Sequence, residues 1–273
     1  MKRLICILCL LGIFIFPSEA EEMPKYVALT FDDGPSGRYT ERLLDELRRR
    51  EVHATFFLCG YRVEQYPALA AQIAADGHEI GCHSDRHSFL DQLTPEEVCR
   101  DLSAACEKIT SATGRRPTLL RPPGGQYDAG ILPETCCADL PVILWSVDPC
   151  DWCCKDMEKI ADRVIQKAKS GDIILMHDMS SSSVDAALRV IDTLEEQGFE
   201  FVTVSELAYL HGVTLQGSEA YRRFSKKEEI SSRNAATEPC AKKGFPPPLP
   251  FKAALSDFTV SRRSPFTRPM AYL

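Results

Sequence analysis

The sequence of 273 residues predicts an α/β protein, a distorted (β/α) barrel of about seven parallel strands. Short apolar runs alternate with amphipathic segments, and several runs lack the polar alternation of a half-exposed sheet. This pattern is typical of parallel strands covered by helices. Every polar cluster follows a predicted strand. This favours a barrel, where chemistry gathers at the carboxyl ends of the strands, over an open sheet with one switch point.

Each element has its own signal in the sequence. Strands are predicted at 26–31, 54–58, 78–83, 117–120, 142–147, 172–176 and 199–204. Helices are predicted at 38–50, 67–76, from 94 onward, and at 184–197. The first helix has Leu43, Leu44 and Leu47 on one face. Thr94, the proline after it and Glu97 form the capping threonine, first-turn proline and returning glutamate that begin a helix.

The two ends of the chain differ from the middle. Residues 1–20 contain the charged, apolar and small-residue zones of a secretory signal peptide, with cleavage expected after Ala20 and an uncleaved anchor as the alternative. The apolar run is too short for a comfortable membrane span. Residues 219–273 are basic and proline-rich without a periodic apolar face, which predicts a disordered tail. The catalytic domain is predicted at 24–212, in a secreted or cell-envelope protein.

The charge distribution and the cysteine content narrow the range of possible partners and cellular locations. The net charge is -7, and residues 219–273 hold 11 Lys or Arg against 5 Asp or Glu, so the body of the protein is acidic. An acidic body argues against nucleic acid as a partner. Ten of the 12 cysteines follow the signal, which suggests disulfides in an exported protein, although the sequence does not give their pairing. A structural metal site at Cys150 and Cys153 is the weaker alternative.

Four residues at strand ends indicate a metal site. Asp32 and Asp33 end the first predicted strand, and the Gly-Pro turn that follows can direct both carboxylates into one cleft. His83 and His87 are four residues apart, directly after the third predicted strand. Two histidines and one carboxylate are three protein ligands, which on zinc leaves a fourth position open, the arrangement of a catalytic site.

Five segments carry a resemblance to a known family. They are Thr30-Phe31-Asp32-Asp33-Gly34-Pro35, His83-Ser84-x-x-His87, Arg121-Pro122-Pro123, Asp148-x-x-Asp151-Trp152 and Leu175-Met176-His177. In order and spacing they resemble the five motifs of the polysaccharide deacetylase family, also called the NodB-homology or carbohydrate esterase family 4 domain. The resemblance covers residues 24–212 and implies a metal-dependent hydrolase that removes acetyl groups from a carbohydrate polymer.

The resemblance assigns roles around the metal. It implies that Asp33, His83 and His87 bind the metal, which is Zn²⁺ or another divalent transition metal. Asp32 would be the base that takes a proton from the attacking water. Ser84 would brace the loop that carries the two histidines.

The resemblance also assigns the remaining catalytic groups. Arg121 would pair with Asp32, and His177 would protonate the leaving nitrogen. Asp148 would hold and charge His177. The acetyl pocket would be walled by Trp152 and Leu175. The alternative for Arg121 and Asp148 is a plain buried ion pair with each other.

The sequence departs from the family pattern in two places. The family commonly has an aromatic residue where this chain has Gly124, followed by Gly125. The main-chain N–H that would help to hold the oxyanion is retained, but the aromatic wall is missing. Cys59 and Cys82 bring thiols near the metal end of the barrel, where they would compete as ligands if free or join two strand ends if paired.

The predicted partner is an acetylated cell-wall glycan, with N-acetylglucosamine or N-acetylmuramic acid of peptidoglycan as the leading substrate. Chitin-type oligosaccharides and O-acetylated xylan remain open, as does a small cyclic amide. A carbohydrate-binding module that has lost its chemistry is the alternative of another class. The protein is expected to be monomeric, without nucleic acid and without a stable membrane span unless the signal remains uncleaved.

Overall fold

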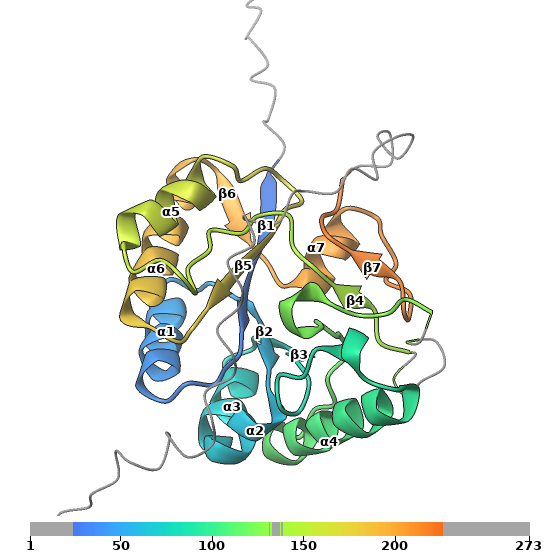
Figure 1. The fold of residues 1–273 in the computed structure, drawn as a ribbon. Coiled ribbons are helices and arrows are strands. Elements are labelled where there is room, and N and C mark those ends of the chain that lie inside the picture. The colour runs from blue at the N-terminus through green and yellow to red at the C-terminus, as the bar shows by residue number, and fades with distance from the viewer. Residues whose placement is uncertain (1–23, 131, 133–136, 138, 226–273) are drawn as a thin grey trace, which may run out of the picture.

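The structure is a computed structural model and describes residues 24–130, 132, 137 and 139–225. Strands lie at the centre of this part, and helices surround them (Figure 1). The strands are β1 (Lys25–Asp32), β2 (Thr55–Leu58), β3 (Glu79–Cys82), β4 (Val142–Ile143), β5 (Ile173–His177), β6 (Phe199–Phe201) and β7 (Ala220–Tyr221). The helices are α1 (Arg38–Arg49), α2 (Gly60–Gln65), α3 (Pro67–Ala75), α4 (Pro95–Thr113), α5 (Met157–Ile165), α6 (Ser181–Glu196) and α7 (Val204–Leu210), with the 3-10 turns η1 (Leu90–Gln92) and η2 (Pro123–Gly125).

The strands pair in parallel, as the sequence predicts. They follow the order β3-β2-β1-β5, and β6 also pairs with β1. Isolated parallel bridges join Cys82 to Leu120, Leu120 to Val142, and Val147 to Ile174, so a path of backbone contacts leads from β3 around to β5. The α/β fold class is confirmed, and this path gives the sheet the closed course of a distorted barrel.

The fourth and fifth predicted strands are shorter than expected. Residues 117–120 contribute only the two isolated bridges of Leu120, to Cys82 and Val142, and β4 covers two residues of the predicted 142–147. Prolines explain part of this difference, because Pro117, Pro122 and Pro141 flank these strands and cannot donate to a ladder of hydrogen bonds. Strand pairing in the barrel is therefore shortest next to segments 121–126 and 148–154.

The folded part reaches further than the predicted domain end at 212. β7 pairs with β4, and Phe224 is buried and donates its N–H to the carbonyl of Gly171 at 2.8 Å. Tyr221 and Phe224 pack in the cluster that contains Ala28. Two apolar residues are too few to show periodicity, so the sequence places residues 219–225 in the tail. The rest of the predicted tail and the predicted signal peptide lie outside the described residues.

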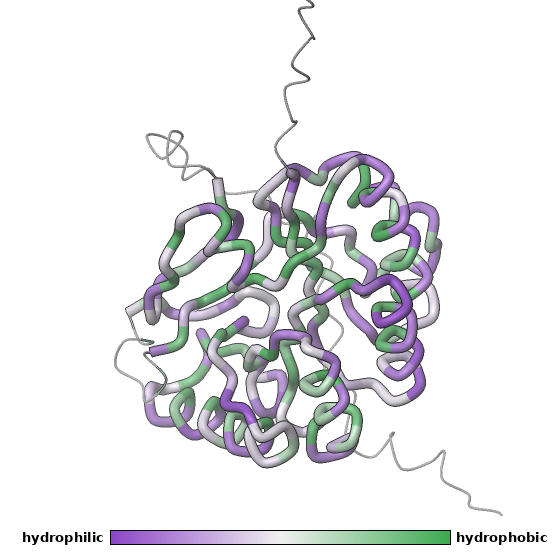
Figure 2. The backbone as a smooth tube through the Cα atoms, turned by 180° about the vertical axis from the view of Figure 1, so that it is seen from behind, coloured by the Kyte–Doolittle hydropathy of each residue, from purple (hydrophilic) through white to green (hydrophobic). Residues whose placement is uncertain are grey.

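The helices bury one face each, as their patterns require. The central strands are hydrophobic and the outer helix surfaces are largely hydrophilic (Figure 2). α1 buries Leu43, Leu44 and Leu47. α4 begins at the predicted capping box, in which Glu97 donates its N–H to Thr94 Oγ1 at 3.3 Å and accepts from the Thr94 N–H at 2.9 Å. No helix in the described ranges is both long and apolar enough to cross a membrane.

Strand register collects the polar strand ends at one end of the barrel. β1 and β5 pair Asp32 with His177, and β1 and β2 pair Asp32 with Phe57. β2 and β3 pair Leu58 with Cys82, the residue before His83. Residues that are far apart in the sequence therefore meet at the carboxyl ends of β1, β3 and β5.

Candidate active site

Three donor atoms converge after β1 and β3. Asp33 Oδ1 lies 3.2 Å from Nε2 of both His83 and His87. It is buried and makes no hydrogen bond to either. The three ligand atoms lie within 4.8 Å of one another, and no other such group of His, Cys, Asp and Glu occurs among the described residues. An orphaned carboxylate oxygen between two imidazoles suits a divalent transition metal.

A backbone carbonyl from outside the loop fixes the ring of His83. His83 Nδ1 lies 2.6 Å from the carbonyl oxygen of Arg121. A carbonyl can only accept, so Nδ1 carries the proton and Nε2 presents its lone pair to the donor group. Ser84 is fully buried, and its Oγ accepts the N–H of Ser88 at 3.0 Å across the loop.

The protonation state of Asp33 matches metal binding. Burial alone would raise the pKa of Asp33, but contacts with His83 and His87 and the charge of His177 lower it well below its usual value. Burial lowers the pKa of His87, and the contact with Asp33 outweighs this and raises it. Asp33 is therefore a carboxylate at neutral pH, the form in which it can bind a cation.

Arg121 fixes Asp32, the carboxylate next to Asp33 in the chain. Its guanidinium is fully buried, and Nη1 donates to Asp32 Oδ1 at 2.8 Å and to Thr30 Oγ1 at 2.6 Å. Nε and Nη2 donate to the carbonyl oxygens of Ile143 and Leu144. The pairing of Arg121 with Asp32 is thus present, and it holds the buried Asp32 side chain beside Asp33. Thr30, which the sequence reasoning did not single out, completes the contact.

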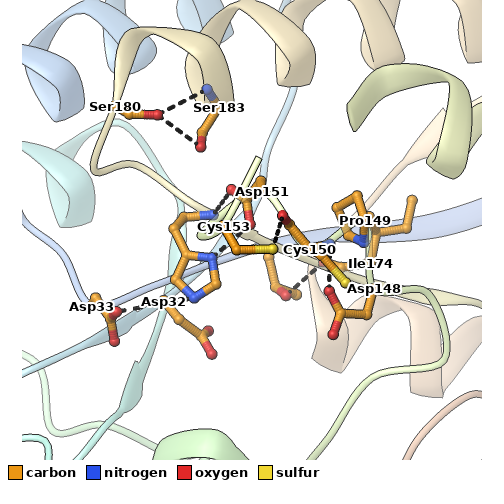
Figure 3. A network of polar contacts seen from close by, with 12 residues as sticks. Asp32, Asp33, Asp148, Pro149, Cys150, Asp151, Cys153, Ile174, Ser180 and Ser183 are labelled. Carbon is orange, nitrogen blue, oxygen red and sulfur yellow. Dashed lines mark hydrogen bonds and ion pairs between the residues drawn. The ribbon is translucent and has the colours of Figure 1, made fainter. Parts of the chain in front are cut away.

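The carboxylate that holds His177 is Asp151, and the prediction of Asp148 is wrong. His177 Nδ1 lies 2.8 Å from Asp151 Oδ1, and its backbone N–H donates to Asp151 Oδ2 at 2.8 Å. Asp148 instead accepts the N–H of Cys150 at 2.7 Å (Figure 3) and forms no ion pair with Arg121. The physical reason is the turn: Cys150 has a left-handed φ of 55°, and the chain reverses so that the next residue faces His177.

Asp151 makes His177 a strong base. Burial lowers the pKa of His177, but Asp151 and then the charges of Asp33 and Asp32 raise it to about 10. His177 Nε2 lies 4.0 Å from Asp33 Oδ2. The His177 side chain is therefore an imidazolium at neutral pH, and it faces the donor group.

The two expected pocket residues lie close in the chain to His177 or to its partner Asp151. Leu175 is buried in β5 two residues before His177, on the same face of the strand. Trp152 is half-buried directly after Asp151. Their roles as walls of an acyl pocket stay predictions.

The glycine turn after Arg121 packs on a different aromatic residue. Gly124 and Gly125 have left-handed φ values of 61° and 69°. A Cβ atom on Gly125 would lie 3.1 Å from the ring of Trp145. The ring of Trp145 therefore lies against the turn whose own aromatic residue is missing. A side chain at Gly125 would be strained by the left-handed backbone and crowded by this ring.

A buried carboxylate that the sequence reasoning passed over lies behind the site. Asp178 is fully buried, Thr40 donates its hydroxyl to Asp178 Oδ2, and a Cβ atom on Gly34 would lie 2.8 Å from Oδ1. Burial raises the pKa of Asp178 to about 6. Its only signal in the sequence is its position directly after His177.

The cysteines near the site do not act as ligands in this geometry. Cys59 is free and buried, and its thiol lies 3.4 Å from the carbonyl oxygen of His83. Burial raises the pKa of Cys59 well above its usual value, so it stays a neutral thiol. Cys82 is also free and buried, whereas Cys99 on α4 is disulfide-bonded.

Fold and site together define a class: an α/β barrel protein with an Asp-His-His donor set between an arginine-paired carboxylate and an aspartate-paired histidine. The profile of the family described as polysaccharide deacetylase matches residues 19–141. A peptidoglycan N-acetylglucosamine deacetylase of Bacillus cereus is 39% identical over 194 residues, which cover 69% of this chain and 91% of the relative. The chain therefore belongs to the polysaccharide deacetylase family.

Two further comparisons extend this assignment. A peptidoglycan N-acetylmuramic acid deacetylase of Bacillus subtilis is 40% identical over 183 residues, 67% of this chain, but the match spans only 38% of that longer protein. A solved family 4 acetyl xylan esterase from Clostridium thermocellum, in complex with a cobalt ion, superposes with a TM-score of 0.68 at 32% identity. That superposition covers 73% of this chain and 98% of the esterase.

Proposed function

We propose that this protein is an exported, zinc-dependent hydrolase that removes N-acetyl groups from cell-wall peptidoglycan. The observation that carries the proposal is one cluster at the barrel end. Asp33, His83 and His87 form a donor set flanked by a base candidate paired with Arg121 and by an acid candidate, His177. This cluster offers candidates for the metal ligands, the base and the acid that amide hydrolysis needs.

Asp33, His83 and His87 would hold the metal. When bound, a divalent metal supplies Lewis-acid chemistry, polarising the acetyl carbonyl and making water a better nucleophile near neutral pH. The cobalt ion in the related esterase structure supports a divalent transition metal, and the nitrogen and oxygen donors here suit zinc.

The chain's own residues would move the protons. Asp32, paired with Arg121, would accept the proton of the attacking water. His177, protonated through its contact with Asp151, would donate a proton to the leaving nitrogen. Leu175 and Trp152 would enclose the acetyl methyl group, and the main-chain N–H of Gly124 would support the oxyanion.

The acid candidate, His177, favours an amide over an ester as the substrate. An amine is a poor leaving group and must be protonated as it departs, and His177 is held in its protonated form by Asp151. The relatives from the two Bacillus species, whose names specify N-acetyl groups of peptidoglycan, support the same choice. Acetylxylan is the second candidate, because the esterase is a close structural neighbour.

The experiment is an acetate-release assay on the purified protein with peptidoglycan, chitin oligomers and acetylxylan. We expect release from peptidoglycan, its loss with a chelator and its restoration by zinc. Asp32→Asn should nearly abolish turnover and keep zinc binding, because it removes the base but not a donor. Acetate release that survives both chelation and His83→Ala would overturn the proposed mechanism. Release from acetylxylan alone would replace the proposed substrate with the second candidate.

A further inference from the structure

The loop of residues 83–88 is held in an unfavourable backbone conformation. Ser84 and His87 have left-handed φ values of 67° and 59°. Such values in residues other than glycine cost about 1 to 3 kcal/mol each and persist only when the surroundings impose them. One restraint lies within the loop, where Ser84 Oγ accepts the N–H of Ser88 at 3.0 Å, and contacts from outside the loop supply the others.

One set of contacts comes from the start of α2. The N–H of Gly60 donates to the carbonyl of Ser84 at 3.0 Å, and the N–H of Tyr61 donates to the carbonyl of Asp85 at 2.8 Å. These bonds hold the first half of the loop. They do not reach the backbone at His87 and Ser88.

The second set comes from α4, through a single carboxylate. Asp101 Oδ1 accepts the N–H of Asp85 at 2.8 Å, and Oδ2 accepts the hydroxyl of Ser88 at 3.4 Å. The two residues that Asp101 contacts, Asp85 and Ser88, lie on either side of His87 in the sequence. Lys108, two turns further along α4, adds an ion pair to the Asp85 side chain at 2.9 Å.

The two histidines depend on these contacts unequally. His83 is oriented by its own hydrogen bond to the carbonyl of Arg121 at 2.6 Å. The ring of His87 contacts the rings of His83 and Phe89, at centroid distances of 5.3 and 6.1 Å. Ring packing restrains an imidazole less than a hydrogen bond does, so the position of His87 follows the backbone of the loop.

We propose that Asp101 is a positioning residue for the metal site, which sets metal affinity by fixing the loop around His87. The inference rests on the proposed role of Asp33, His83 and His87 as metal ligands. Asp101 does not touch the metal or the substrate. Loss of a direct hydrogen-bond partner of a metal ligand typically weakens metal binding about 10- to 100-fold, and we take the same range for Asp101 because its two bonds lie on either side of His87.

The test measures metal binding without substrate. The zinc dissociation constant is determined by competition with a chromogenic chelator, and the visible absorption of the cobalt-loaded protein reports ligand geometry. Asp101→Ala should weaken zinc binding about 10- to 100-fold and change the cobalt spectrum. Asp101→Asn keeps an oxygen for the N–H of Asp85 and should restore most of the affinity. Glu107→Ala removes an exposed carboxylate from the same helix and should change neither readout.

The outcomes separate the two proposals. If the wild-type protein binds no zinc, the proposed function fails and the inference fails with it. If the wild type binds zinc and Asp101→Ala matches Glu107→Ala, the inference alone is overturned. If Asp101→Ala does not fold, Ser88→Ala takes its place, because it deletes only the hydroxyl bond. It should weaken zinc binding in the same direction, and an unchanged affinity and spectrum would contradict the inference.

Discussion

Replacement of Asp151 by asparagine isolates the effect of its charge on His177. Asn is nearly the same size and keeps an oxygen for the histidine, but it removes the negative charge 2.8 Å from Nδ1. The pKa of His177 is raised from 6.5 to about 10, a net effect of roughly 5 kcal/mol at about 1.4 kcal/mol per pH unit. Asp151 makes the largest favourable contribution, ahead of Asp33 and Asp32. We therefore assign about 2 to 3 kcal/mol to Asp151, the scale of a charge-assisted hydrogen bond.

This loss should appear in the chemical step and in its pH dependence. A cost of about 2 to 3 kcal/mol corresponds to a fall in kcat of roughly 30- to 150-fold, with a smaller change in KM. His177 acts as an acid only when protonated, so activity disappears as the pH rises through its pKa. Asp151→Asn lowers that pKa, and the alkaline limb of the pH profile should move toward neutral pH.

The assay is acetate release from peptidoglycan between pH 6 and about 10, with Asp148→Asn as the matched control. Asp148 contacts the N–H of Cys150 and not His177, so its variant should keep the wild-type alkaline limb. The reasoning is refuted if the two variants lose activity equally, or if the limb stays in place in Asp151→Asn.

Two further predictions concern stability. Burial lowers the pKa of His78 from 6.5 to about 4, so between these values the unfolded chain binds a proton that the folded chain does not. The free energy of unfolding should fall by roughly 3 kcal/mol as the pH drops through this window. Urea unfolding should show a weaker pH dependence in His78→Asn, and equal slopes would contradict the assignment. Gly60→Ala would place a Cβ atom 2.2 Å from Asp85 Oδ1 and should destabilise the protein by about 1 to 3 kcal/mol, whereas Gly130→Ala should change little in the same assay.

The donor set was predictable because its signals are local. Asp33 follows an apolar strand at a glycine turn, and His83 and His87 share one loop. Once parallel strands are inferred, their carboxyl ends must lie at one end of the sheet. The sequence therefore indicated both the fold class and the residues that meet there, without any knowledge of distances.

The choice between Asp148 and Asp151 could not be made in the same way. Both follow one strand within four residues, and motif spacing alone leaves either free to face His177. The left-handed turn at Cys150 decides between them. A single backbone dihedral changes the direction of a side chain without changing the composition of the motif.

The chain by itself determined the alternation of strands and helices, the helix start at Thr94 and the residue types at the strand ends. Only the tertiary structure decided that Phe224 packs on the barrel, that Asp151 holds His177 and that Asp101 reaches the metal loop from α4. The physical reason is the separation in sequence over which each kind of interaction acts. Periodicity and capping act within a few residues, whereas these contacts join segments whose approach depends on the closure of the whole barrel.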